Sequence, residues 1–317
     1  MASINGINIF KKPHIKSPIM IAGWPGMGAV ATQAIDYVRQ QLKAELFAEI
    51  DTRDFMQPHS VVVSEGVGKF PNVPRILLFY SEKANLIICE GEEQFSGKSA
   101  LTIAGRLLEL AKNLKVKKIF TGAAFVQHMN HRDKPMVYTV ANNQDLREWL
   151  VHEKGMKTLK RGQISGLNGS ILGFAAQEKI DAACFLSTIP IYAVNLPNPK
   201  AAKSIVDEWQ KVIGFSVSLK GFDRAIKETD KTLEMVEDQL KKLSFGGIYE
   251  DSDDKEENIQ TENTNEVPPQ IRGKIEHLFE SAKKDKRIAH RLKEELDRWM
   301  LFKEYEDRFL DLFSDSQ

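Results

Sequence analysis

Short apolar runs alternate with amphipathic segments along most of the chain. Residues 18–23 are typical of a short buried strand, and the glycines within residues 26–28 turn the chain. A helix with one apolar face follows, formed by Ala31, Ile35, Val38 and Leu42. Residues 46–50 then predict a further strand. A strand–helix–strand unit of this kind is the signature of a parallel sheet covered by helices.

The same alternation continues beyond this first unit. Further strands are predicted from their Val, Ile, Leu and aromatic content at residues 61–63, 75–80, 86–90, 118–121 and 182–189. Helices are predicted at residues 98–114 and 144–153, and Asn198 opens another. The apolar face of that last helix is made of Ile205, Trp209 and Val212. The chain is therefore expected to form an α/β domain.

Residues 222–243 predict a longer helix of a different kind. Its packing positions recur at alternating three- and four-residue steps, the spacing of a helix seam. They are Ile226, Thr229, Leu233, Val236, Leu240 and Leu243. The seam covers less than three heptads, which does not support a long isolated coiled coil. The pattern favours a helix packed on its own domain, with a contact between subunits as the alternative.

An acidic segment separates this α/β part from the end of the chain. Residues 250–266 contain eight acidic residues, one Lys and a single bulky aliphatic residue, Ile259. So little apolar surface cannot offset the entropy of ordering the backbone. The expected organisation is an α/β domain over residues 1–245, a flexible acidic linker over 246–268 and a helical tail over 269–317.

Two apolar stripes within the tail predict a pair of short helices. The first stripe is Ile271, Ile275, Leu278 and Ala282, and the second is Ile288, Leu292, Leu296 and Trp299. A two-helix hairpin of this size is marginal alone, so it is expected to dock on its own core, a neighbouring subunit or a client. The aromatic end of the tail supplies three candidate contact residues, Phe309, Leu310 and Phe313.

The charge of the chain limits the class of partner. Lys and Arg together number 44, as do Asp and Glu, so the formal net charge is zero. This balance argues against a global field that recruits nucleic acid or an anionic membrane, and the basic residues are dispersed without interleaved aromatics. Low net charge also leaves self-association weakly opposed. Protein partners and a homo-oligomer are therefore expected.

The cysteines and the uncharged runs indicate a cytoplasmic protein. Cys89 and Cys184 each lie in an apolar run and are too few for a disulfide scaffold, which favours buried thiols in a reducing compartment. Residues 17–35 and 182–199 carry no charge, but prolines and glycines interrupt both runs. Neither run is therefore expected to form a membrane-spanning helix.

The segment from Gly91 to Ser99 is the nearest approach to a phosphate-binding loop. It lies between a predicted strand and a predicted helix, but five residues separate its glycines where the motif needs four. Glu92 and Glu93 would also place negative charge where phosphate oxygens must lie. An ordinary strand-to-helix turn, with Ser96 as a potential helix cap, is the favoured interpretation.

Residues 23–28 form a second glycine-rich strand-to-helix loop, Gly-Trp-Pro-Gly-Met-Gly. Backbone amides at the start of the following helix could hold an anion, which leaves a nucleotide-dependent ligase or hydrolase as the alternative function. The favoured interpretation is a tight turn with an exposed Trp24–Pro25 pair, because no acidic ribose partner is convincingly placed. Trp24, Pro25 and Met27 are therefore candidate contacts for a protein partner.

Other candidate chemistry is weak. His128 and His131, with Asp133 nearby, could hold a metal ion, but a zinc site needs further ligands and no cysteine is close in sequence. Ser165 and Ser170 do not lie in the G-x-S-x-G pattern of a nucleophile elbow. We therefore assign no catalytic, cofactor-binding or metal-binding residue from the sequence.

Several segments in this order resemble one protein family. They are Gly23–Gly28, Asn72-Val73-Pro74-Arg75 before a strand, Thr121-Gly-Ala-Ala-Phe125, Gly166-Leu-Asn-Gly-Ser-Ile-Leu-Gly173 and Leu186-Ser-Thr-Ile-Pro190. By these segments the chain resembles the proteasome assembly chaperone family, also called the PAC2 family. The resemblance covers approximately residues 15–245.

The resemblance implies a three-layer α/β/α domain with a mostly parallel sheet, similar to nucleoside phosphorylases but without their catalytic machinery. It implies a non-enzymatic, cofactor-free protein that binds other proteins as a homo-oligomer, with proteasome subunits as candidate partners. Several family members end in a hydrophobic–tyrosine–any tripeptide that docks on the proteasome α-ring. The chain ends Asp315-Ser316-Gln317, so docking through that tripeptide is not expected.

Overall fold

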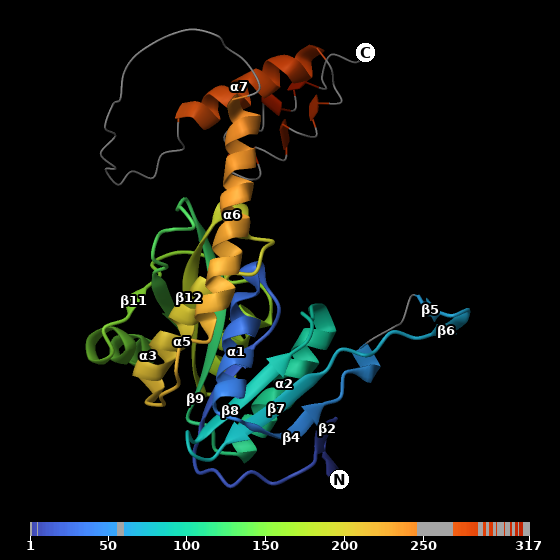
Figure 1. Ribbon diagram of the computed structural model, residues 1–317, viewed down its shortest axis with the longest axis vertical. Helices are drawn as coiled ribbons and strands as arrows, with labels where there is room; N and C mark the ends of the chain where they lie inside the picture. Colours follow the sequence, from blue (N-terminus) through green and yellow to red (C-terminus); the bar gives the residue numbers. More distant parts are fainter. Residues whose placement is uncertain are drawn as a thin grey trace. The chain divides into compact units, whose positions relative to one another are not determined.

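The computed structural model describes residues 2–4, 6–55, 60–245 and 269–284, together with single residues and pairs between 288 and 312. The chain divides into two compact units, Met1–Ile248 and Tyr249–Gln317 (Figure 1). The expected acidic linker lies outside the described residues, so the three-part organisation stays a prediction.

The first unit is built on a ten-stranded sheet in the described residues. Its strands in spatial order are β1 (Ala2–Ile4), β2 (Ile7–Ile9), β4 (Glu45–Ile50), β7 (Ile76–Ser81), β8 (Leu86–Gly91), β3 (Ile19–Gly23), β9 (Lys118–Gln127), β12 (Asp181–Pro190), β10 (Val137–Ala141) and β11 (Lys157–Thr158). The four central strands β8, β3, β9 and β12 are parallel. Antiparallel pairs flank them on both sides.

The predicted strand–helix–strand unit is present with a wider crossover than the sequence indicates. β3 and β4 point in the same direction, because β4 is antiparallel to β7, β7 is antiparallel to β8, and β8 is parallel to β3. Strands β7 and β8, which come later in the chain, occupy the two positions between them. The order of the strands is therefore decided by long-range pairing.

Helices cover both faces of this sheet and give the expected three layers (Figure 1). The described helices of the first unit are α1 (Val30–Gln41), α2 (Gly97–Asn113), α3 (Gln144–Glu148) with a π-helical turn at Trp149–Glu153, α4 (Leu167–Gln177), α5 (Pro199–Ile213) and α6 (Phe222–Phe245). Helices α2 and α4 pack on one face, and α1, α3 and α5 pack on the other. Across the described residues we find no helix with the length and hydrophobicity that a membrane span requires.

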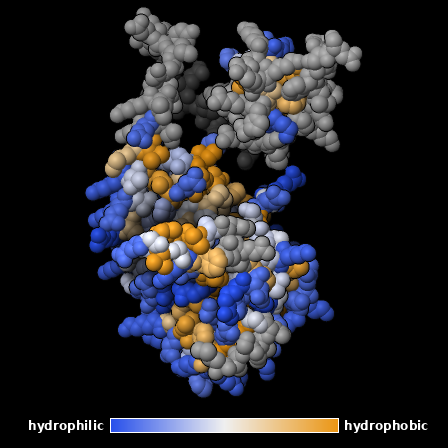
Figure 2. Space-filling view, turned by 90° about the vertical axis from the view of Figure 1, so that its right-hand side faces the viewer, coloured by the Kyte–Doolittle hydropathy of each residue, from blue (hydrophilic) through white to orange (hydrophobic). Residues whose placement is uncertain are grey.

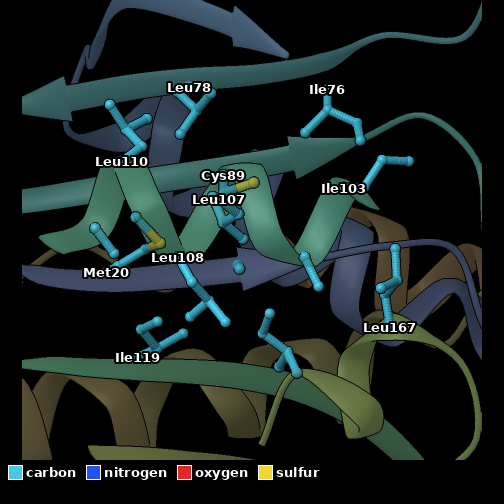
Figure 3. Packing of buried hydrophobic residues seen from close by; sticks show 14 of the residues in the cluster. Met20, Ile76, Leu78, Cys89, Ile103, Leu107, Leu108, Leu110, Ile119 and Leu167 are labelled. Atoms are coloured by element: carbon cyan, nitrogen blue, oxygen red, sulfur yellow. The ribbon is translucent and has the colours of Figure 1, made fainter. Parts of the chain in front are cut away.

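The face covered by α2 shows how helical spacing produces the core. Ile103, Leu107 and Leu110 recur every three or four residues and point toward the sheet, where they meet Met20 of β3 and Leu78 of β7 (Figure 3). All five side chains are buried. Each large aliphatic side chain removed from water in this way contributes about 1.5–3 kcal/mol.

On the opposite face, α5 begins and ends where its sequence predicts. The Asn198 side chain accepts a hydrogen bond from the backbone N–H of Ala201 at 3.0 Å, and Pro199 occupies the first helical position. The expected apolar face is buried: Ile205, Trp209 and Val212. Gly214 then ends the helix in the left-handed region.

One predicted strand lies outside the main sheet. Residues 61–63 contribute to β5 (Val62–Ser64), which pairs only with β6 (Val67–Lys69) in a separate two-stranded sheet. Glu65 and Gly66 between the strands both have positive φ, as a tight hairpin turn requires. The turn brings β6 back onto β5, so β5 is paired locally and not with the main sheet.

Helix α6 packs on its own domain, as the favoured interpretation of its seam predicts. Leu233 is buried, and Ile226 packs against the same apolar cluster as α5. Ion pairs join the helix to the domain at Lys203–Asp223 (2.7 Å) and Lys200–Asp230 (2.9 Å), and Arg132 pairs with Glu234. The side chains of Leu240 and Leu243 lie outside the described part of α6, so a subunit contact further along the helix stays a prediction.

The second unit contains α7 (Pro269–Lys284) and an apolar cluster of its own. The cluster consists of Ile275, Phe279, Ala282, Ala289, Leu292, Leu296, Leu301 and Phe309. The prediction that Phe309 is an exposed contact residue is wrong, because its ring is buried in this cluster. Leu310 and Phe313 lie outside the described residues. Both predicted stripes thus supply members of one core within the tail.

Candidate functional site

The loop between β3 and α1 lies at the carboxyl end of the parallel strands. Gly28 has a φ of 64°, and a side chain there would meet Asn198 Cβ at 3.2 Å. Position 28 therefore favours glycine for both its conformation and its close packing. The chain can then enter α1 directly from the end of β3, in the position where many α/β proteins bind ligands.

Within this loop, the prediction that Trp24 and Pro25 form an exposed pair is wrong. Trp24 is fully buried and Pro25 is half-buried. The indole packs against Gly91 at the end of β8, where an added Cβ would lie 2.1 Å from Trp24 Cδ1. Trp24 is therefore a core residue that anchors the loop and does not contact a partner. Met27, in contrast, is 46% exposed.

Two amide side chains hold the loop in place. Asn168 Oδ1 accepts a hydrogen bond from the Trp24 N–H, and Asn168 Nδ2 donates to the Trp24 carbonyl, both at 2.9 Å. Gln94 Nε2 donates to the Pro25 carbonyl, and Gln94 Oε1 accepts from the Leu167 N–H at 3.0 Å. The start of α4 and the segment before α2 are thereby fastened to the loop.

The sequence analysis did not single out Asn168 or Gln94 as functional residues. Asn168 lies in the glycine-rich segment that carries the family resemblance, but nothing local predicts its partner, which is 144 positions away. The available signal in the sequence was an Asn in a mostly apolar segment, since a polar group that is buried there is nearly always hydrogen-bonded.

A cavity of about 410 Å³ lies beside the loop, at the ends of β9 and β12. Its lining residues are Pro25, Gly26, Met27, Ala31, Gln94, Ala123, Ala124, Phe125, Val126, Gln163, Ile164, Ser165, Gly166, Asn168 and Leu186. None of these described lining residues has a side chain that titrates. The walls are mostly apolar, and the polar groups are amides, backbone atoms and one hydroxyl. Such a surface can bind an apolar segment but offers no group for proton transfer.

Two acidic side chains at the end of β8 and in the turn that follows it are paired. Glu92 forms an ion pair with Arg75 at 2.7 Å, and Glu90 forms one with Arg39 at 2.8 Å. Burial raises the pKa of the Glu90 carboxyl, and the Arg39 guanidinium only partly offsets this effect. Ser96 occupies the cap position of α2 without a side-chain cap bond. The segment from Gly91 to Ser99 is therefore a strand-to-helix turn and not a phosphate cradle.

The two histidines considered as metal ligands lie in different environments. His128 is exposed, whereas His131 is buried, with Nδ1 3.1 Å from the Tyr192 hydroxyl and 3.2 Å from a Glu237 carboxylate oxygen. In the described part of the chain no group of three or more His, Cys, Asp or Glu side chains is arranged to hold a metal ion. His131 instead helps to fasten α6 to the domain.

We expect Mg-ATP to bind the purified chain with a dissociation constant above about 10 μM. Arg75 is already paired with Glu92, and the described cavity lining carries no charged side chain. Neither therefore offers a free cation to neutralise a triphosphate. Isothermal titration calorimetry at low salt measures this constant. Tight, saturable binding would contradict the prediction and would favour the nucleotide-dependent alternative.

Comparisons with known proteins identify a family and similar folds. The model of the PAC2 family matches residues 20–244. PbaB of Pyrococcus furiosus, described as an archaeal proteasome activator, is 25% identical with a TM-score of 0.63, covering 73% of this chain and 98% of its own. PbaA of the same organism, described as an archaeal homologue of a proteasome-assembly chaperone, is 21% identical with a TM-score of 0.59, covering 76% and 95%. A comparison with curated proteins found no match.

Proposed function

The chain belongs to the PAC2 family, and from this premise we propose that it is a non-enzymatic, protein-binding protein of the assembly-chaperone type. It acts as a homo-oligomer in the cytoplasm and binds proteasome subunits. The names of PbaB and PbaA support this choice of partner. The two buried free thiols, Cys89 and Cys184, support a reducing compartment.

The main support for this proposal is that the described lining of the cavity has no titratable side chain. In an enzyme of this fold class the carboxyl edge of the parallel strands would present acids, bases or a nucleophile. The described lining offers the Ser165 hydroxyl but no base beside it. Burial also raises the pKa of Cys184 to about 12 and that of Cys89 further, so neither thiol ionises near neutral pH. The arrangement suits binding of another protein better than catalysis.

Met27 and Pro25 are the residues of the loop that we assign to the partner. Both line the cavity, and Met27 is among the more exposed large hydrophobic side chains of the first unit. A flexible thioether at the rim of an apolar cavity adapts readily to a partner surface. The amide clamp of Asn168 and Gln94 holds this rim in a fixed position.

Affinity purification of the full chain with quantitative mass spectrometry tests the proposal. We expect proteasome subunits to be retained, and we expect Met27→Ser to reduce retention about tenfold, equivalent to roughly 1.4 kcal/mol of lost contact. Met136→Ser is the matched control, because Met136 is 40% exposed and does not line the cavity. It should retain the wild-type amount. Absence of proteasome subunits from the wild-type sample would contradict the proposed partner.

A further inference from the structure

Strand β9 extends beyond its neighbour on one side. It pairs with β12 along its whole length, to Gln127, but its pairing with β3 ends at Thr121. The chain then leaves β3 for the glycine-rich loop, and the N–H of Trp24 donates to Asn168 Oδ1 instead of to β9. Residues 122–127 therefore have a neighbouring strand on the β12 side only, and we call their other side the open edge of β9.

The register shows which backbone groups point to the open edge. On β3 the N–H of Ile19 donates to the β8 side, so Ala22 points toward β9, where it lies opposite Thr121. A residue in a parallel pair bonds to the two residues that flank the one opposite it, so even-numbered residues of β9 point toward β3. Ala124 and Val126 therefore direct their N–H and C=O groups past the end of β3. Among the described residues, none forms a hydrogen bond with these groups.

The cavity described above lies along the open edge. Its lining includes four consecutive residues of β9, Ala123–Val126. Their side chains alternate between the two faces of the sheet, since Ala123 and Phe125 pack with one apolar cluster and Ala124 and Val126 with the other. Side chains on opposite faces border one cavity only at the edge of a strand. The cavity therefore occupies the place of a missing neighbouring strand.

We propose that the partner binds here as an extended peptide that pairs with the open edge of β9. The inference rests on the proposed function and specifies the form in which the partner enters the cavity. Free N–H and C=O groups along a strand edge are complemented by another extended backbone, the mode of recognition called β-strand addition. A helix uses its backbone groups internally, so it does not complement this edge.

The open edge also limits the length and chemistry of the bound segment. It allows a paired segment of about four residues, which span roughly 13 Å. Apolar side chains suit this segment, because Phe125 and Leu186 line the cavity from one face of the sheet and Ala31 of α1 lines it from the other. Beyond the cavity the surface is mixed, since Figure 2 shows hydrophobic side chains among hydrophilic ones on the side that it draws. The preference for apolar residues therefore applies to the paired segment alone.

Amide exchange in the free chain tests the open edge itself. We expect the N–H groups of Ala124 and Val126 to exchange at least about tenfold faster than those of Ala123 and Phe125, which point to β12 and are held in the sheet. Nuclear magnetic resonance of the full chain measures all four rates. Equal protection of the four amides would overturn the inference, because the edge would already be paired.

A strand-forming peptide tests binding. The probe is a fluorescent hexapeptide of alternating valine and threonine, and the control is the same peptide with its internal amides N-methylated. We expect saturable binding of the probe by fluorescence anisotropy and at least about tenfold weaker binding of the control, because N-methylation removes the donors that strand pairing needs. Equal binding of the two peptides would overturn the inference.

Two substitutions at one position separate the backbone from the side chain. Val126→Pro removes an N–H that points to the open edge and leaves the bonds to β12, as prolines on edge strands do. Val126→Ala keeps that N–H and removes only side-chain contacts. We expect the probe to bind about tenfold more weakly to Val126→Pro and about threefold more weakly to Val126→Ala. Circular dichroism checks that both variants are folded, and an equal loss in the two would overturn the strand pairing.

The outcomes also separate this inference from the proposed function. Retention of proteasome subunits without binding of the hexapeptide would leave the proposed function standing and overturn the strand pairing. Hexapeptide binding in the expected pattern without retained proteasome subunits would support the strand pairing and overturn the choice of partner.

Discussion

Gly91→Ala is expected to lower the free energy of unfolding by about 3 kcal/mol, the upper part of the usual range for overpacking a core. The added Cβ would lie 2.1 Å from Cδ1 and 2.4 Å from Nε1 of Trp24. Because Trp24 is fully buried, its ring cannot move toward solvent to relieve the contact. Either the end of β8 or the loop after β3 must shift. Urea denaturation followed by circular dichroism measures the loss.

Gly105→Ala is the matched control for this substitution. Gly105 lies within α2, and an added Cβ there meets nothing within 4 Å. We expect a gain of about 0.5–1 kcal/mol, because alanine has the higher helix propensity and lowers the entropy of the unfolded chain. A neutral Gly91→Ala would show that Trp24 is not packed against the end of β8 as the structure describes.

Asn168→Ala is expected to cost about 4 kcal/mol, since each buried polar group left without a partner costs about 1–3 kcal/mol. The substitution removes both hydrogen bonds to the Trp24 backbone and leaves its N–H and carbonyl unpaired in a buried setting. The Asn168 carbonyl also accepts a hydrogen bond from the Thr121 hydroxyl at 2.6 Å. That contact involves the backbone, so it is retained only if the start of α4 keeps its position.

Asn142→Ala separates loss of stability from loss of the site. Asn142 also bridges two backbone groups, donating to the Ile180 carbonyl at 2.8 Å and accepting from the Ala182 N–H at 3.0 Å. It does not line the cavity. Under conditions where both variants are folded, we expect Asn168→Ala to reduce capture of proteasome subunits and Asn142→Ala to leave it intact. Equal capture by both would contradict the role of the Asn168 clamp in presenting Met27.

Much of the architecture could be predicted from local pattern alone. The three- and four-residue spacing of Ile205, Trp209 and Val212 is a property of one helix, and burial of that face follows wherever the helix packs. Asn198 caps the same helix through a neighbour three residues away. Such features depend on residues close together in the chain, so the positions of most strands and helices along the chain, the α/β class and the first half of α6 were predictable.

The candidate site was predictable only in part. The glycine-rich loop of residues 23–28 was recognised as a strand-to-helix turn, and Met27, named there as a candidate contact, is exposed. The orientation of Trp24 was not, because a tryptophan between two loop-forming residues looks exposed from its neighbours. Its burial depends on Gly91, and its backbone is satisfied by Asn168.

Periodicity and capping act over a few residues, so they were enough to predict most of the helices and central strands, although not β10 or α4. Contacts between distant segments place β7 and β8 between β3 and β4 and bury Phe309 within the tail, and the tertiary structure was needed to see them. Each of these outcomes depends on which surfaces meet across long separations in the chain. Local propensity carries no information about such pairings, since they are selected by the combined free energy of packing and hydrogen bonding.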